Sequence, residues 1–243
     1  MALQLEPLEQ FVIKPIVPLH IGKFDVSFTN SALLMTIAVL VVSAIVVIGT
    51  RREELVPGRI QSLGELAYEF VGNMIDETVG AEGQRYFPFI FTLFMFILFG
   101  NLLGLIPFGY SFTGQIIVTF AMAAVVFIGV TLIGIWRHGW HFLSFFVPHG
   151  VPFVLLVLLV PIELLSYLIR PFTLSIRLFA NMLAGHTMLA IFGGFAASIG
   201  VLGLLPLGLD ILIFFLELLV AVLQAYVFAI LTCLYLNDAI HLH

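Results

Sequence analysis

The sequence predicts an all-α polytopic membrane protein with about five membrane helices, one interfacial amphipathic helix, and a final pair of long, strongly tilted helices that form an antiparallel hairpin. Hydrophobic residues make up 62% of the 243 residues and charged residues only 9%, whereas a soluble domain carries about 25% charged residues. The mean hydropathy is +1.20. The apolar residues stand in long runs, unlike the short alternating segments of a membrane β-barrel. This pattern excludes a soluble enzyme and a disordered chain, and the absence of basic stripes excludes a nucleic-acid binder.

The whole chain, 1–243, is expected to form one integral-membrane domain, because no Gly/Ser-rich linker or internal repeat divides it. Residues 1–30 form a segment outside the membrane. Its acidic residues and prolines precede any apolar run, which is the wrong order for a cleaved signal peptide. The single cysteine, Cys233, lies in an apolar run and is expected to be a small buried thiol.

Three ordinary spans are predicted at 31–49, 87–107 and 115–136, since a spanning helix needs about 20 mostly apolar residues. The stretch 57–83 is different. Its apolar residues recur at intervals of three and four among acidic ones, which indicates an amphipathic helix at the membrane interface or against a partner.

The remaining chain is apolar but too long for two ordinary spans, and it is predicted to form a channel hairpin from residues 151–199 and 208–236. At about 1.5 Å per residue, the first of these helices would be roughly twice as long as the hydrocarbon core is thick. It must therefore tilt strongly, or bend at Pro161 and Pro171. The break between the two helices is expected at the glycine and proline cluster of residues 200–208.

Basic residues set the expected orientation. Arg51, Arg52 and Arg59 follow the first span, and Arg137 follows the third. Because basic loops stay in the cytoplasm, the N-terminus is expected outside and the C-terminus inside.

Ionisable side chains interrupt the last two helices, where each costs about 2.5–3.5 kcal/mol at the membrane centre and normally marks an ion pathway. Spacings of four and seven residues place several polar residues on one helix face with Arg177. These are Glu163, Arg170, Thr173 and Asn181 on the first helix, while Asp210, Glu217 and Gln224 repeat the seven-residue spacing on the last.

Folding the hairpin about Val201–Leu202 places His186 level with Glu217, and Arg177 within one turn of Gln224. Histidine and glutamate can pass protons near neutral pH, whereas arginine stays charged because its pKa exceeds 12. The arrangement therefore predicts a proton wire that is interrupted by a fixed positive charge.

Structural roles remain open for some of these residues. Glu163 and Arg170 could form a buried ion pair, Gln224 could hold two helices together, and Asp210 could contact only outside water. The histidines of the 137–149 loop have no acid or cysteine to complete a metal site. No metal and no cofactor are expected, and the absence of a phosphate-binding loop leaves nucleotide chemistry to partners.

Three motifs resemble those of subunit a of F-type ATP synthases, called subunit 6 in mitochondria. The run TLSIRLFANMLAGH covers residues 173–186, FGNLLGLIP covers 99–107, and LQAYVF covers 223–228. The resemblance extends over about 59–238. It implies a stator that loads and unloads protons on a neighbouring ring of c subunits through two offset half-channels.

The resemblance also implies residue roles. Arg177 separates the half-channels beside Thr173, Asn181 and Gln224. It places His186, Glu217 and Asn101 in the inlet path and Glu163 in the outlet path. Besides these matched residues, Asp210 is expected to supply outer charge to the inlet, and Arg170 is expected in the outlet path. Some relatives carry acids near Asn101, where this chain has Gly104 and Gly109.

The expected partners are the c-ring, b-type peripheral stalk subunits, the rest of the F0F1 complex and membrane lipids, without nucleic acid. The resemblance implies an energy-transducing membrane, either the bacterial inner membrane or the mitochondrial inner membrane, and no enzymatic activity of the isolated chain. The alternatives are an unrelated ion-coupled secondary transporter, an intramembrane enzyme and a structural scaffold. The first usually shows internal repeats and the second a catalytic motif, and neither feature is visible.

Overall fold

The computed structural model describes residues 12–18, 20–21, 24–25, 27–51, 58–106, 110–140, 142, 147, 153–199 and 203–241. Six long helices make up most of this part of the chain: α1 Asn30–Arg51, α2 Arg59–Thr78, α3 Phe87–Gly104, α4 Ile116–His138, α5 Phe153–Ser198 and α6 Leu204–Ile240. Two short 3-10 helices, η2 Ala81–Tyr86 and η3 Phe112–Gly114, precede α3 and α4. Five of the described helical segments are long and apolar enough to cross a membrane, which confirms the predicted class.

The segment before α1 contains two short antiparallel ribbons that the sequence reading did not anticipate. Strand β1 Pro15–Val17 pairs with β4 Phe28–Thr29, and β2 His20–Ile21 pairs with β3 Phe24–Asp25. The side chain of Asn30 ties the ribbon to the start of α1, because its Oδ1 accepts from the Lys14 amide at 3.2 Å and its Nδ2 donates to the Val12 carbonyl at 3.2 Å.

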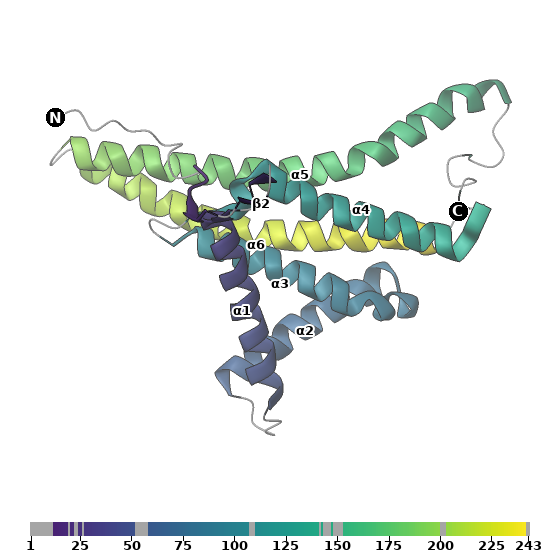
Figure 1. The fold of residues 1–243 in the computed structure, drawn as a ribbon, viewed down its shortest axis with the longest axis horizontal. Coiled ribbons are helices and arrows are strands. Elements are labelled where there is room, and N and C mark those ends of the chain that lie inside the picture. Colours follow the sequence, from purple (N-terminus) through teal and green to yellow (C-terminus); the bar gives the residue numbers. More distant parts are fainter. Residues whose placement is uncertain are drawn as a thin grey trace.

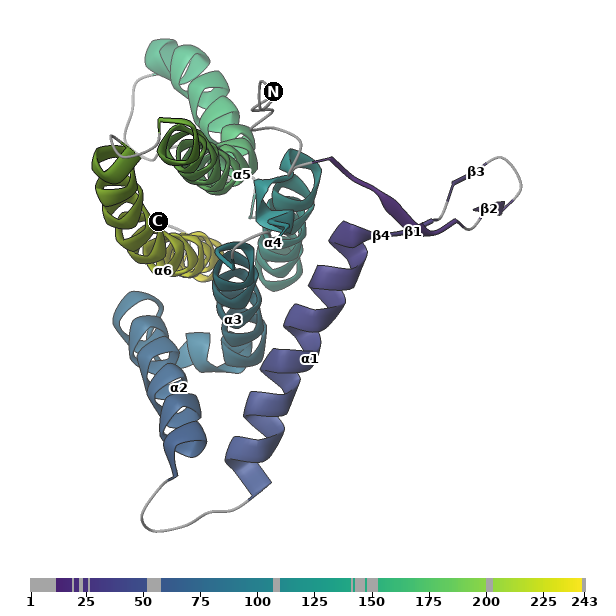
Figure 2. The same ribbon diagram turned by 90° about the vertical axis from the view of Figure 1, so that its left-hand side faces the viewer.

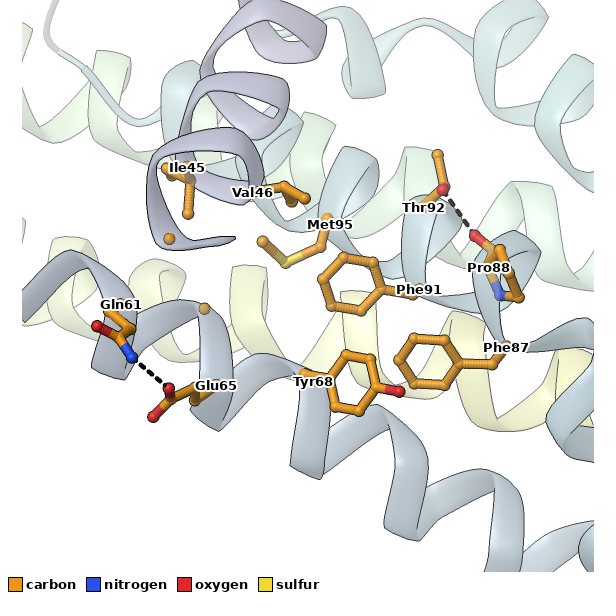
Figure 3. A pocket seen from close by; sticks show the side chains of 12 residues that line it. Ile45, Val46, Gln61, Glu65, Tyr68, Phe87, Pro88, Phe91, Thr92 and Met95 are labelled. Carbon is orange, nitrogen blue, oxygen red and sulfur yellow. Dashed lines mark hydrogen bonds between the residues drawn. The ribbon is translucent and has the colours of Figure 1, made fainter. Parts of the chain in front are cut away.

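The amphipathic helix α2 ends at Thr78, earlier than the expected end at residue 83. Gly80 has a φ of 81°, a conformation that glycine adopts without steric cost, and the chain then continues as η2. Between α1, α2 and α3 lies an apolar hollow of about 530 Å³, into which Tyr68, Phe87 and Met95 point (Figure 3).

Helices α3 to α6 pack side by side, and α1 and α2 diverge from them (Figure 2). The core contains fully buried side chains from five helices: Ile75 of α2, Ile97 of α3, Val126 of α4, Leu178 of α5 and Phe228 of α6. Helices α5 and α6 run antiparallel along the longest axis of the molecule, at a steep angle to α1 (Figure 1).

Helix α5 has 46 residues and is therefore about 70 Å long, more than twice the hydrocarbon thickness of about 30 Å. It continues without a break through Pro161 and Pro171, and Figure 1 shows it changing direction in its N-terminal half. Of the two expected responses to its length, the structure shows a change of direction in the half of the helix that contains both prolines, and the tilt stays a prediction.

The turn between α5 and α6 lies at the start of the expected 200–208 break, and α6 begins at Leu204 instead of residue 208. A side chain on Gly203 would place its Cβ 2.2 Å from the carbonyl oxygen of Ala196, so the close approach at this turn requires glycine. The expected midpoint Val201–Leu202, the arginine Arg52, Pro107, Gly109 and most of the 137–149 loop lie outside the described residues.

Candidate functional site

A histidine–glutamate pair lies inside the hairpin, where α5, α6 and α3 meet. The His186 ring bonds through Nδ1 to Oε1 of Glu217, and both side chains are buried. The sequence predicted that His186 and Glu217 lie at the same level of the hairpin, and in the structure the two side chains are in direct contact. On the other side of the ring, Nε2 lies 3.1 Å from the carbonyl oxygen of Gly104 in α3.

The hydrogen bonds of His186 determine where its protons lie. A carbonyl oxygen only accepts, so Nε2 carries a proton and donates it to Gly104. Nδ1 then accepts from a protonated Glu217 when the ring is neutral, or donates to ionised Glu217 when the ring is charged. One proton lies between Nδ1 and Oε1 in both cases. The pair can exchange this proton internally, which is what a relay in a membrane requires.

Glycines on α5 and α3 make room for this pair. A Cβ on Gly185 would lie 2.6 Å from Glu217 Oε1, a distance that no real methyl group tolerates. A Cβ on Gly104 would lie 2.9 Å from Ser111 and 3.3 Å from His186 Nε2. The sequence gives no charge or hydrogen-bonding group that would mark these two glycines as site residues, although Gly185 lies in the TLSIRLFANMLAGH motif directly before the histidine.

Further polar groups extend from the pair toward the connection between α3 and α4. Asn101 is fully buried and donates through Nδ2 to the Ala221 carbonyl of α6 at 3.0 Å. Ser111 and Thr113 share a buried hydroxyl–hydroxyl hydrogen bond of 3.1 Å. Oδ1 of Asn101 and Oε2 of Glu217 are buried without a partner among the described protein groups. Such atoms normally bind water or a ligand.

Asp210 lies seven residues before Glu217, about 10 Å along α6, and is half-buried. Its carboxylate faces α5, where a Cβ on Gly193 would lie 3.8 Å from Oδ2. Oδ1 is buried without a described partner. The structure therefore places Asp210 on the same side of the hairpin as the His186–Glu217 pair, nearer the turn.

Arg177 occupies a different environment, about 13 Å from His186 along α5. It is exposed, as are Thr173, Ala180 and Asn181 on the same helix face. No carboxylate among the described residues pairs with it. The sequence predicted that Arg177 of α5 lies within one turn of Gln224. In the structure Asn181, four residues later on α5, contacts Gln224, and its Nδ2 donates to Oε1 at 2.8 Å.

The opposite half of the hairpin holds an ion pair that the sequence reading did not identify. Arg170 Nη1 donates to Oδ2 of Asp238 at 2.9 Å, and the guanidinium lies over the rings of Tyr167 and Tyr235 at 5.2 and 4.9 Å. The sequence suggested Glu163 as a partner of Arg170, and the pair that the structure shows joins α5 to Asp238 near the end of α6. Asp238 carried no signal beyond its position at the end of an apolar run.

Cys233 is a free, buried cysteine, as predicted. Within the part of the chain that the structure describes, no group of three or more histidine, cysteine, aspartate or glutamate residues is arranged to hold a metal ion. The side chains of His186 and Glu217 are of types that can transfer protons.

The fold and the site define a class: a helical membrane protein in which one long hairpin carries a buried, hydrogen-bonded histidine–glutamate pair and an exposed arginine that no described carboxylate pairs with. A sequence model described as "ATP synthase A chain" matches residues 32–237. The chain belongs to this family.

Similar proteins cover nearly the whole chain. It is 52% identical over 244 residues to ATP synthase subunit a of Paramagnetospirillum magneticum, with 98% of this chain and 99% of that protein covered. It is 52% identical over 238 residues to ATP synthase subunit a of Rhodospirillum rubrum, with the same coverage, and 52% identical to that of Pelagibacter ubique, with 98% of each chain covered. Family membership gives the chain its role as the proton-channel stator in the F0 sector.

Proposed function

We propose that the chain provides two offset half-channels, which meet a ring of c subunits at the exposed arginine face of α5. The observation that carries this proposal is the contrast between Arg177, which is exposed and without a carboxylate partner among the described residues, and the buried His186–Glu217 pair. An unpaired arginine within a membrane helix is costly, so a carboxylate on another subunit is its expected partner.

The residues around Arg177 are suited to close packing of another helix. Thr173, Ala180 and Ala184 are small and exposed, and small residues let membrane helices approach closely. A guanidinium that stays charged attracts an ionised ring carboxylate. It also repels a proton that would otherwise pass directly between the half-channels, where each 100 mV across the membrane is worth about 2.3 kcal/mol per charge.

The inlet half-channel, in this proposal, starts near Asn101 and Asp210 and reaches the ring through the His186–Glu217 pair. Its support is the chain of buried polar atoms on that side of the hairpin. The outlet half-channel lies toward Glu163 and the Arg170–Asp238 pair. The positions of the basic residues support an inlet outside and an outlet in the cytoplasm, with the N-terminus outside and the C-terminus inside an energy-transducing membrane.

Stalk subunits of the b type and the remaining F0F1 subunits complete the proposed assembly. The chain itself forms the path and carries out no nucleotide chemistry. The ion that it passes is a proton, which the family's role and the buried histidine–glutamate pair both support.

Cysteine cross-linking in the assembled complex tests the arginine face. Ala180→Cys and Ala184→Cys on α5 are expected to cross-link to c subunits with a short bifunctional reagent, whereas Val125→Cys on the exposed side of α4 is not. Membranes with the unsubstituted chain, whose Cys233 is buried, give the background level of cross-linking. Cross-linking of the α4 variant to c subunits, with none from the two α5 variants, would place the ring on another face and contradict the proposal.

A further inference from the structure

A polar hollow of about 370 Å³ lies where η2 meets the end of α4, away from the hairpin site. Its walls are Ala81, Glu82, Arg85, Tyr86 and Arg137. Glu82 pairs with Arg137, and among the described residues no carboxylate pairs with Arg85. The hollow therefore carries two guanidinium groups and one carboxylate, so a single added negative charge would neutralise it.

An apolar groove of about 110 Å³ begins beside this hollow, between α3, α4 and α6, and Tyr86 lines both. The other groove residues are Phe89, Ile90, Gly129, Val130, Ile133, Thr232 and Leu236. On α4, Gly129, Ile133 and Arg137 follow one another at four-residue intervals, which places them along one side of the helix. Gly129 and Arg137 are thus about 12 Å apart along the axis.

Two tryptophans mark the level of the hollow in the bilayer. Trp136 and Trp140 flank Arg137 and are 92% and 90% exposed. Tryptophan gathers where the hydrocarbon meets the headgroups, so Arg137 lies at headgroup depth and the groove runs from there into the hydrocarbon. An arginine pair at this depth is suited to a phosphate, which planar guanidinium groups bind through two hydrogen bonds.

We propose that this hollow and groove form a binding site for one anionic phospholipid, with its phosphate on Arg85 and Arg137 and part of one acyl chain along Gly129 and Ile133. A free phosphate would use only the hollow and leave the groove unused. A zwitterionic lipid would leave the excess positive charge of the hollow uncompensated. The site is independent of the proton path and depends only on α4 crossing the membrane.

The purified whole complex tests this site with a phosphatidylglycerol that carries a photoreactive group on one acyl chain. We expect labelling of α3 near Phe89 and of α4 near Ile133. The double variant Arg85→Gln/Arg137→Gln is expected to bind the probe roughly 30-fold more weakly, since each arginine near the surface contributes about 1 kcal/mol and 1.4 kcal/mol is tenfold. Arg59→Gln removes an exposed arginine at the start of α2 and is the matched control.

Further variants separate the parts of the site. A Cβ on Gly129 would meet no atom within 4 Å, so Gly129→Leu adds a side chain at the groove and is expected to reduce labelling, while Ala121→Leu, two turns away on α4, leaves it unchanged. Arg85→Lys/Arg137→Lys keeps the charge and is expected to retain most of the binding if the glutamine variant fails to assemble. Equal labelling by a phosphatidylcholine that carries the same photoreactive group would overturn the proposal. So would full competition by inorganic phosphate, or labelling that is the same in the Arg85→Gln/Arg137→Gln and Arg59→Gln complexes. A neighbouring subunit cross-linked into the groove would also overturn it.

Discussion

The hairpin of α5 and α6 contains two polar sites that differ in burial and in pairing. The His186–Glu217 pair is buried and hydrogen-bonded, and its histidine contacts a third helix through the Gly104 carbonyl. Arg177 is exposed, and no carboxylate among the described residues pairs with it. The hydrogen bond between His186 and Glu217 forms within one chain, whereas in the proposed mechanism Arg177 gains its carboxylate partner from another subunit.

In the proposed mechanism the two sites have different tasks: the His186–Glu217 pair relays protons, and Arg177 contacts the rotor. A proton relay needs its groups within hydrogen-bond reach, directly or through one water, when the proton moves, so fixed packing suits it. A rotor contact must form and break at each step, and a pair buried permanently in one chain could not do so. A well-paired buried ion pair gains little beyond its desolvation cost, so a transient pair at Arg177 can attract a ring carboxylate without trapping it.

The largest effect is expected at Arg177. Arg177→Ala should reduce both ATP synthesis and ATP-driven proton pumping in membrane vesicles to background, because nothing then separates the half-channels or draws the ring carboxylate into its ionised form. Arg177→Lys keeps a charge but loses the planar guanidinium and can lose its proton, so it should retain little coupled activity. The amount of assembled complex, measured by immunoblot of subunits, should be unchanged. Normal pumping in the alanine variant would show that the arginine has no such role.

The second-largest effect is expected at the His186–Glu217 pair. Glu217→Gln removes one proton-carrying group, and passive proton flux through F0 should fall by about 100-fold, the lower end of what a positioned acid–base group contributes to a proton transfer. The exchanged double variant, His186→Glu with Glu217→His, should conduct better than either single change, because the two groups still meet. A double-mutant cycle on flux measures this coupling, and additive effects would argue against a shared site.

A smaller effect is expected from the glycine that makes room for Glu217. In Gly185→Ala the new methyl group would lie 2.6 Å from Oε1, which must push the carboxylate away from His186. Overpacking of this kind costs about 1–3 kcal/mol, so flux should drop roughly tenfold. Gly193→Ala is the matched control on the same helix, since its Cβ would lie at an ordinary 3.8 Å from Asp210. A similar flux loss in both variants would indicate a general effect on α5 instead of a displaced carboxylate.

Much of this molecule was predictable from the sequence because membrane helices follow simple rules. Apolar run length predicted the five spans, and the excess length predicted the tilted hairpin. The separation of His186 and Glu217 from the Gly/Pro cluster predicted that the two side chains meet, because two antiparallel helices rise equally per residue.

The contacts that were missed involve groups without a sequence pattern. The Gly104 carbonyl that binds His186 belongs to the backbone, so the residue type at position 104 gives no signal. Asp238 lies at the end of an apolar run, and only the packing of α5 against α6 brings it to Arg170. The end of α2 at Thr78 depends on the backbone conformation of Gly80, and the period of the apolar residues continues past it.

The smallest effect is expected at the Arg170–Asp238 pair, which is intermediate in exposure between the buried His186–Glu217 pair and the exposed Arg177. It is paired within the chain, like the histidine site, but the side chains of Arg170 and Asp238 are still 22% and 36% exposed. A pair this accessible contributes only about 0.2–1 kcal/mol, and the rings of Tyr167 and Tyr235 continue to hold the guanidinium after the carboxylate is removed. Asp238→Asn should therefore change coupled pumping by about twofold, with Tyr235→Phe as a control that keeps the ring. A loss as large as that of Arg177→Ala would mean that Asp238 itself carries protons in the outlet path and does more than position α6.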